Sequence, residues 1–447
     1  MLCQKSLKMF CFSALLLVAL SPSAWTADET LEARIVALEE ELSVLRAIVT
    51  AIIPPAAVAP LPVNNGGVLQ EKAPNVDQVA AVSQGFSYQG FIQFDTLLSR
   101  YSDGKPGNAS LDDFLIPIDI PVNPNSPESF TSTNMSAKTS RFGFATDHTT
   151  EIGRISSLVE LDFALSAQGN ERISNSWSSR IRHAYVDWQL SETSQLVAGQ
   201  TWTTFMRAEA RPALWDMTGG VGQTFNRQPL IRWRHGRWSF AAENPATRLD
   251  GVYYDYGQEA VPDLIARYDG QIGPLEWTLA GMVRQLNYRD ERADEPIRED
   301  DVVGYAASFA GNWQTRGNDF SFMLNYGDAL GRYMGLNAFS DGVVTDSGDI
   351  KTYEQVGGLL SWNRRLNRHW QAGVALSAAW ADVPSQDIYS AAGLLPEHYA
   401  SGHFSFWYRP SASLSLGSEY IRAVKRLENG DSGSLDRLMF SVRYKLK

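Results

Sequence analysis

Apolar and polar residues alternate along most of the chain from residue 86 onward. In the segments 158–165, 275–284 and 437–446, apolar residues recur at every second position and more polar residues stand between them. A segment with one apolar face and one more polar face is typical of a half-buried β-strand. The frequent glycines, 35 in all, and the Asn-Gly and Asp-Gly pairs indicate turns between such strands.

Sixteen candidate strands can be traced, and the lengths of their connections follow a rule. The strands begin near residues 86, 139, 156, 179, 194, 228, 237, 262, 274, 301, 318, 352, 368, 398, 412 and 433. Connections after even-numbered strands are short, as at 191–194, 235–237 and 409–412. Connections after odd-numbered strands are usually long, as at 97–138, 205–227, 246–261, 328–351 and 382–397. A β-sandwich has no reason to sort its connections in this way. An outer-membrane barrel does, because its periplasmic turns are short and its external loops long.

The sequence therefore predicts an all-β fold, a 16-stranded antiparallel transmembrane β-barrel over residues 85–447. Tryptophans recur near the short connections and support this interpretation. They are Trp188, Trp233, Trp238, Trp313, Trp362, Trp370 and Trp407. Membrane barrels carry such aromatic girdles at the level of the lipid headgroups. The alternative is that these residues are ordinary core tryptophans.

A different periodicity precedes the strands. Apolar residues are spaced alternately by four and three between residues 31 and 52, at Leu31, Ile35, Leu38, Leu42, Leu45, Val49 and Ile52. This heptad spacing predicts an α-helical coiled coil over residues 28–53, of two or three strands. An amphipathic helix packed on its own domain is the alternative. Pro54-Pro55 ends the helix, and residues 54–84 are expected to form a flexible linker.

The first 27 residues are typical of a secretory signal peptide. Lys5 and Lys8 precede an apolar run, Met9–Leu20, which is followed by small residues. Removal of residues 1–27 takes away both cysteines and leaves 37 basic and 50 acidic residues, a net charge of −13. A thiol-free chain excludes cysteine nucleophiles and thiolate metal sites. No other stretch approaches the length of apolar sequence that a membrane-spanning helix needs, about 20 residues.

Several stretches of the barrel resemble the DcaP-like family of trimeric outer-membrane porins. They are Gly199-Gln-Thr-Trp-Thr-Thr-Phe205, Arg227-Gln-Pro-Leu-Ile-Arg232, Ala242-Glu-Asn-Pro245, Tyr326-Gly-Asp-Ala-Leu-Gly-Arg-Tyr333 and Gly417-Ser-Glu-Tyr-Ile421. The resemblance covers nearly all of the mature chain. It implies a periplasmic coiled coil, a homotrimer and a channel for small organic acids and dicarboxylates. The chain departs from many outer-membrane barrels at its end, where Tyr444-Lys-Leu-Lys447 replaces a terminal aromatic residue.

Parity along the strands predicts which arginines face the lumen. Where Ile231 and Trp233 face lipid, Arg232 and Arg234 face inward, and the same rule turns inward Arg141, Arg267, Arg284, Arg437 and Arg443. The loop 205–227 is the third external loop, which in porins commonly folds in to narrow the pore. It carries Arg207, Arg211 and Arg227. Arginine presents a permanent charge and a planar fork that suits carboxylates, so these residues are the candidate constriction. In the alternative, the arginines pair with Glu160, Asp162, Asp187 and Glu243 and only stabilise the wall.

The expected function is that of an outer-membrane porin for small, anionic solutes. The expected partners are the lipid bilayer, lipopolysaccharide and two further copies of the chain, with a periplasmic or peptidoglycan contact through the coiled coil and none with nucleic acid. The six histidines show no metal-ligand spacing, and no nucleophile elbow or phosphate-binding loop is present, so no catalytic residue, metal or cofactor is expected. A plugged barrel that tethers the envelope and an outer-membrane hydrolase are the alternatives.

Overall fold

The computed structural model describes residues 85–107, 112–123, 125, 128–165, 168–169, 174–251, 260–291 and 297–446. The signal peptide expected at 1–27, the coiled coil expected at 28–53 and the linker expected at 54–84 lie outside the described residues. Among the residues that are described, no helix is long and apolar enough to cross a membrane.

The described chain is built almost entirely of β-strands. In chain order they are β1 Gly85–Tyr101, β2 Phe130–Ser136, β3 Arg141–Thr150, β4 Gly153–Asp162, β5 Arg180–Gln189, β6 Ser194–Trp202, β7 Arg227–His235, β8 Trp238–Glu243, β9 Leu249–Asp250, β10 Asp263–Ile272, β11 Leu275–Asp290, β12 Arg298–Thr315, β13 Asn318–Asp328, β14 Gly342–Val344, β15 Ile350–Thr352, β16 Glu354–Arg365, β17 Trp370–Asp382, β18 Pro396–Tyr408, β19 Leu414–Leu427 and β20 Ser432–Leu446. Four single-turn 3-10 helices lie in the loops: η3 Pro117–Asp119, η4 Ala208–Ala210, η5 Gly331–Tyr333 and η6 Ala392–Leu394.

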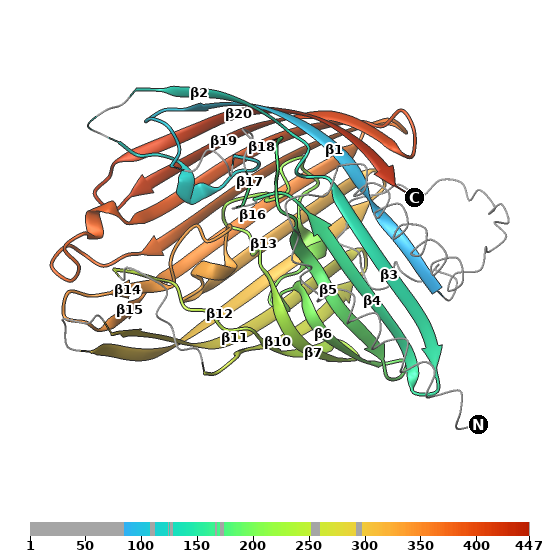
Figure 1. The fold of residues 1–447 in the computed structure, drawn as a ribbon, viewed down its shortest axis with the longest axis horizontal. Helices are drawn as coiled ribbons and strands as arrows, with labels where there is room; N and C mark the ends of the chain where they lie inside the picture. Colours follow the sequence, from blue (N-terminus) through green and yellow to red (C-terminus); the bar gives the residue numbers. More distant parts are fainter. Residues whose placement is uncertain are drawn as a thin grey trace, which may run out of the picture. The chain divides into compact units, whose positions relative to one another are not determined.

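The strands form one antiparallel sheet that closes on itself. Each strand pairs with the next in the order β1, β3–β8, β10–β13 and β16–β20, and β20 pairs with β1 from Leu446 opposite Gly90 to Leu435 opposite Tyr101. In Figure 1 the strands follow one another from β3 in teal through β10–β13 in yellow to β16–β20 in orange and red, with β20 beside β1. The predicted 16-stranded antiparallel barrel is confirmed.

The second barrel strand is interrupted. Both β2 and β3 pair with β1, β2 along Asp95–Tyr101 and β3 along Gly85–Phe91. The residues between them leave the ladder, and Ser140 instead accepts the Gln93 N–H on its hydroxyl at 3.0 Å. This break allows one long strand to bend. The small strands β9, β14 and β15 form a separate three-stranded sheet within the loops.

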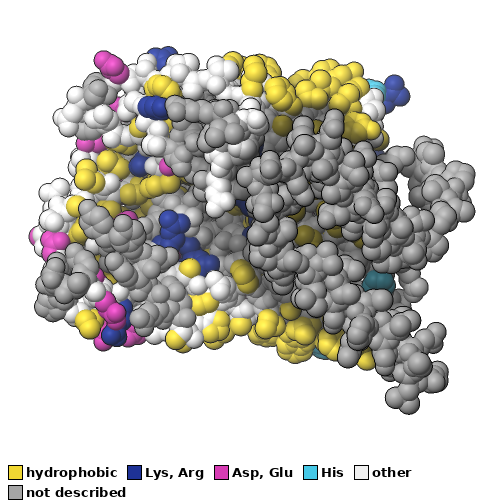
Figure 2. Space-filling view, viewed as in Figure 1, with side chains coloured by type: hydrophobic (Ala, Val, Ile, Leu, Met, Phe, Trp, Pro, Cys, Tyr) yellow, Lys and Arg dark blue, Asp and Glu magenta, His cyan; other side chains and the backbone are white. Residues whose placement is uncertain are grey.

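Apolar side chains of the barrel wall face outward and polar ones face inward, which is the reverse of their arrangement in a soluble protein. Along β1, Ile92, Phe94 and Leu98 are exposed, whereas Gln93 and Asp95 are buried. The same alternation runs around the ring, because successive residues of a strand point to opposite faces. Figure 2 shows hydrophobic side chains along the outer edges of the molecule, while the acidic side chains visible on this face gather at the end with the long loops. An apolar exterior and a polar interior suit a barrel in lipid.

Connections at the two ends of the barrel differ in length as predicted. We call the end with the short turns 150–153, 190–193, 236–237, 273–274, 316–317, 366–369 and 409–413 the turn end, and the opposite end the loop end. The longest connections at the loop end are 102–129, 203–226 and 329–353. One connection, 428–431, is short, so the rule holds for most odd-numbered strands and not for all of them.

The aromatic girdle at the turn end is present in part. Trp233, Trp238, Trp313 and Trp362 are exposed on the outer face, and Trp188 and Trp370 are half-buried. The assignment of Trp407 to the girdle is wrong, because this side chain is only 4% exposed. Trp407 points inward, where its ring stacks on Trp215 at a centroid distance of 3.8 Å and an interplanar angle of 16°.

Candidate functional site

The connection 203–226 between β6 and β7, which we call loop L3, folds into the lumen and crosses it. It is buried along nearly its whole length. Gly222 N–H donates to Ser377 Oγ on β17 at 2.8 Å, and Trp215 Nε1 donates to the Phe406 carbonyl on β18 at 3.1 Å. Because β6 and β17 are eight strands apart in a ring of sixteen, these contacts reach the opposite wall. The expected infolding of the third external loop is confirmed.

A glycine allows loop L3 to approach the far wall closely. A Cβ atom on Gly222 would lie 2.0 Å from the Ala378 carbonyl oxygen and 2.6 Å from the Gly358 amide nitrogen. Both of these atoms belong to the backbone of the wall and cannot move aside easily. Only glycine therefore fits where the loop meets β16 and β17.

The tip of loop L3 is held by a buried carboxylate. The backbone N–H groups of Trp215 and Asp216 both donate to Glu419 on β19. The other oxygen of Glu419 lies 2.9 Å from His403 Nδ1. Two backbone donors on one carboxylate fix the path of the loop at this point.

A second loop, 329–353 or loop L6, also enters the lumen and packs on loop L3. Phe225 N–H donates to the Tyr333 carbonyl at 2.8 Å, and Gly335 N–H donates to the Gln223 carbonyl at 3.0 Å. Tyr333 and Phe339 are fully buried in the apolar cluster that these loops form with the wall. This infolding was not predicted, although the apolar residues within the long connection 328–351 are a signal for it in the sequence.

Two of the predicted site arginines are held by fixed partners. Arg207 donates to Glu276 Oε2 at 2.8 Å, to Asn312 Oδ1 at 3.1 Å and to Thr278 Oγ1 at 3.2 Å, which fastens loop L3 to β11 and β12. Arg284 is fully buried and donates to Asp341 Oδ1 at 2.6 Å. Both guanidinium groups are thus engaged with groups of the protein.

Arg284 also joins the wall to two loops. The Nη1 atom that donates to Asp341 also donates to the Ala329 carbonyl at 2.9 Å, Nη2 donates to the Ala246 carbonyl at 2.5 Å, and Nε lies 3.5 Å from Asp263 Oδ1. The sequence predicts that Arg284 faces inward, and it does. Its partner Asp341 comes from loop L6, so the contact is a clamp between loop and wall.

Two other predicted arginines lie against aromatic rings at the root of loop L3. The guanidinium of Arg227 lies 4.6 Å from the ring centre of Trp202, and that of Arg211 lies 5.2 Å from the same ring. Phe225 meets Trp202 edge to face at 5.0 Å. The Nη1 atom of Arg227 is buried and has no hydrogen-bond partner among the described residues. A cation over a ring is stabilised without a carboxylate, so the buried Nη1 of Arg227 can still donate a hydrogen bond, whereas Arg211 already donates to the Met217 carbonyl.

The neighbouring wall adds further arginines on β5, which parity alone does not assign to the lumen because a β-bulge opposite Glu160 and Leu161 shifts the register of this strand. Arg182 on β5 pairs with Glu160 at 2.8 Å and with Asp162 at 2.7 Å, and Arg180 pairs with Asp162 at 2.6 Å. The predicted site residue Arg141 on β3 lies 3.5 Å from Glu160. The expected alternative, pairing with these carboxylates, thus applies to Arg141.

We call Arg141, Arg180, Arg182, Arg211 and Arg227 the guanidinium cluster. Four of its members act electrostatically on His183, which places them around one point of the lumen. Within the described residues, Arg141, Arg180 and Arg182 pair with Glu160 and Asp162, whereas Arg211 and Arg227 lie against Trp202. The cluster is a cationic patch beside the root of loop L3.

Arg232 and Arg234 lie nearer the turn end. Their cross-strand partners Val197 and Gln195 are buried, so both arginines stand on the lumen-facing side of β7 as predicted. Arg232 is half-buried and makes no hydrogen bond or ion pair within the described barrel, and Arg234 is exposed and donates only to the Gly236 carbonyl at 3.2 Å. They extend the positive surface from the cluster toward the short turns.

Burial raises the pKa of two titratable groups in the loops, Asp112 and Tyr333. Asp112 accepts the Tyr101 hydroxyl at 2.9 Å and pairs with Arg437, and its burial raises the pKa of the carboxyl above the ordinary value although Arg437 acts in the opposite direction. Burial raises the pKa of the Tyr333 phenol well above its ordinary value. Tyr333 therefore stays neutral and donates to Asp263 at 2.6 Å.

A closed antiparallel barrel of sixteen strands, apolar outside and polar inside, with its third long loop folded into the lumen, defines an outer-membrane channel of the porin class. The profile of the DcaP outer membrane protein family matches residues 67–445, and the chain belongs to this family. The family and the fold are those of channels and not of enzymes.

Solved structures agree with this fold. The outer membrane channel DcaP of Acinetobacter baumannii matches with a TM-score of 0.64 and 20% identity, over 81% of this chain and 97% of that chain. More distant matches, both with a TM-score of 0.48 and 10% identity over 81% of this chain and 100% of the other, are OmpT of Vibrio cholerae lacking loop L8 and the anion-selective porin from Comamonas acidovorans. No curated protein matches the sequence.

Proposed function

We propose that this protein is an outer-membrane channel that lets small anions, in particular organic mono- and dicarboxylates, diffuse across the membrane. The observation that carries the proposal is the Arg227 guanidinium, stacked on Trp202 with a buried Nη1 that no described group satisfies. A carboxylate that enters the lumen can supply the missing acceptor. The positive charge of the guanidinium groups gathered there acts in the same direction.

The physical reason lies in the narrowness of the lumen beside loop L3. Fixed charges there are screened less than on an open surface, so they attract solutes of opposite sign more strongly. Guanidinium groups can replace part of the hydration of a carboxylate with paired hydrogen bonds. Arg232 and Arg234 would pass the anion on toward the turn end, which we infer faces the periplasm.

The reversal potential across a planar bilayer with a salt gradient tests this proposal. The parent channel is expected to prefer chloride over potassium, and Arg211→Gln with Arg227→Gln should shift the potential toward cations and weaken block by a dicarboxylate such as succinate. Arg422→Gln is the matched control, since Arg422 lies 54% exposed on β19 and pairs with Asp436 outside the cluster. A cation-selective parent would overturn the proposal, and the absence of conductance steps would identify the alternative, a plugged structural barrel.

We further infer that three copies assemble and that residues 28–53 support the trimer, on the basis of the heptad spacing from Leu31 to Ile52. Native mass spectrometry of the full chain should show a trimer. Deletion of residues 28–53 should weaken it or leave a trimer held by the barrels alone. Monomers only, from the intact chain, would contradict this inference.

A further inference from the structure

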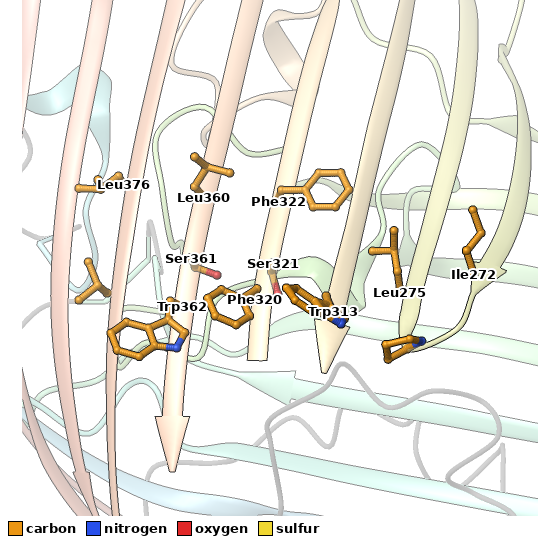
Figure 3. A pocket seen from close by; sticks show the side chains of 12 residues that line it. Ile272, Leu275, Trp313, Phe320, Ser321, Phe322, Leu360, Ser361, Trp362 and Leu376 are labelled. Carbon is orange, nitrogen blue, oxygen red and sulfur yellow. The ribbon is translucent and has the colours of Figure 1, made fainter. Parts of the chain in front are cut away.

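An apolar groove runs along the outer surface of the barrel near the turn end. It has a volume of about 800 Å³ and is lined mainly by residues of β11, β12, β13, β16 and β17. Figure 3 shows its side chains in two rows: Leu376, Leu360 and Phe322 form the upper row, and Trp362, Phe320 and Trp313 the lower one. The groove lies outside the lumen and takes no part in the proposed passage of anions.

The strand register explains the two rows. Leu360 is paired with Phe322 and with Leu376, while Trp362 is paired with Phe320. Gly311 stands in the upper row opposite Phe322, where a Cβ atom would lie 2.8 Å from the Phe322 ring. The absence of a side chain at this position lets the ring lie flat and keeps the groove open.

The next row toward the turn end is polar and cationic. Asn318 is paired with Arg364, and its side-chain oxygen accepts both Trp362 Nε1 at 3.1 Å and Arg364 Nη1 at 3.0 Å. The adjacent turns carry the exposed residues Arg316 and Arg368. In the described part of the chain, no carboxylate forms an ion pair with any of these three arginines. The groove thus changes from apolar to positively charged within one row.

The surface is apolar along the groove and cationic at its end, and a phospholipid carries its apolar tails and its headgroup in the same order. Trp313 and Trp362 mark the depth at which tails end and headgroups begin, since tryptophan prefers that level. In a bilayer the tail gains little from an apolar wall, because its other neighbours are equally apolar. The shape of the groove and the charge at its end therefore determine which lipid is retained. The arginines favour a headgroup with a net negative charge.

We propose that this groove is a binding site for an anionic phospholipid of the periplasmic leaflet. The acyl chain lies along Leu360, Phe322 and Trp362, and the phosphate lies against Arg364 and Arg316. The site rests on the proposed function only in that the turn end faces the periplasm. Not every turn is suited to this role: the turns 150–153 and 190–193 carry Glu151 and Glu192 instead of arginine.

The test is lipid retention by the full-length protein in detergent, measured by native mass spectrometry. The protein is incubated with equal amounts of phosphatidylglycerol and phosphatidylethanolamine that carry the same acyl chains. We expect phosphatidylglycerol to be retained preferentially, and Arg316→Gln with Arg364→Gln to reduce this preference by about fivefold for each arginine removed. Arg237→Gln with Arg422→Gln removes two exposed arginines that lie away from the groove and should leave lipid retention unchanged.

A second variant tests shape independently of charge. Leu360→Trp fills the groove and should reduce the retention of both lipids, whereas Leu279→Trp, on the outer face but away from the groove, should not. Equal retention of the two lipids by the parent, or unchanged retention in the double arginine variant, would overturn the proposal. Finding a second copy of the chain bound at the groove in place of lipid would also overturn the proposal. Anion selectivity should persist in Arg316→Gln with Arg364→Gln, so the two proposals can fail separately.

Discussion

The two walls of the lumen use the same side chain in opposite ways. On the wall from β10 to β13, Arg207 and Arg284 are engaged by carboxylates, amides and backbone carbonyls. Beside the wall from β3 to β7, Arg211 and Arg227 lie against the ring of Trp202, and the Nη1 atom of Arg227 has no hydrogen-bond partner among the described residues. The first pair fastens loops to the wall, and the second is placed to meet a solute.

The difference follows from what the loops contribute. Loop L6 brings Asp341 against Arg284, and a buried ion pair of this kind is costly to break because it leaves an isolated charge. Loop L3 brings no carboxylate to Arg227 and instead adds Arg211 and Phe225. Facing the lumen is thus not enough to make an arginine part of a selectivity site. Whether an arginine can meet a solute depends on the partner that the nearest loop supplies.

The largest expected effect concerns the clamp. Arg284→Met should leave Asp341 buried without its counter-charge and lower the free energy of unfolding by about 3–5 kcal/mol. Denaturant titration of the protein in phospholipid vesicles measures this loss. Arg289→Gln is the control, since its exposed pairs with Glu291 and Glu299 are screened by solvent and should contribute little to stability. Equal losses in the two variants would break the comparison between clamp and exposed pair.

The next effect concerns the far end of loop L3. Glu419→Ala removes the acceptor of the Trp215 and Asp216 N–H groups and should destabilise the loop tip by about 1–3 kcal/mol. The loop should then leave the far wall more often, so single-channel conductance should rise and become noisier. Glu397→Ala, in a weak exposed pair with Arg426, should leave conductance unchanged. Unaltered conductance in Glu419→Ala would show that other contacts suffice to hold the loop.

A smaller effect is expected from the ring beneath Arg227. Trp202→Leu removes a cation–π contact of about 0.5–2 kcal/mol and lets the guanidinium take other positions. Anion preference, read from the reversal potential, should fall by less than in the Arg211→Gln and Arg227→Gln double variant. Trp233→Leu removes an outward-facing tryptophan of the neighbouring strand β7 and should not change the anion preference. A larger fall in Trp202→Leu than in the double variant would assign selectivity to the ring itself.

The smallest effect is expected near the turn end. Arg232→Gln with Arg234→Gln removes two charges, of which Arg234 is open to solvent, and salt screens such charges over about 8 Å at 0.15 M and about 3 Å at 1 M. The shift in reversal potential should therefore be clear in dilute salt and vanish near 1 M. A shift that is independent of salt would place these arginines in the constriction together with Arg227.

Much of the fold could be predicted because local patterns determine it. Period-two alternation located all sixteen barrel strands, and the lengths of the connections predicted which end carries the turns. Parity also turned the predicted wall arginines toward the lumen, as at Arg284 and Arg232. Each of these inferences needs only neighbours in sequence, since the pleat of a strand assigns alternate residues to opposite faces.

The remainder depended on contacts between distant segments. Trp407 has the position of a girdle tryptophan, but the ring of Trp215 in loop L3 covers it from inside. Whether Arg284 would be engaged or available depended on Asp341, which lies in a loop distant in sequence from Arg284. Parity counted from the outward-facing Val186 places Arg182 on the lipid side, and only the β-bulge between β4 and β5 turns it to the lumen beside Glu160 and Asp162.

The pairing of β20 with β1 has a consequence for assembly. These two strands stand at opposite ends of the barrel sequence, so the ring has two open edges until they meet. Contacts between such distant segments form slowly, and unpaired edges invite association with other chains. Closure therefore joins the earliest and latest parts of the barrel sequence. A chain truncated before Ser432 would lose every hydrogen bond of this seam at once, and with it the watertight boundary between lumen and lipid.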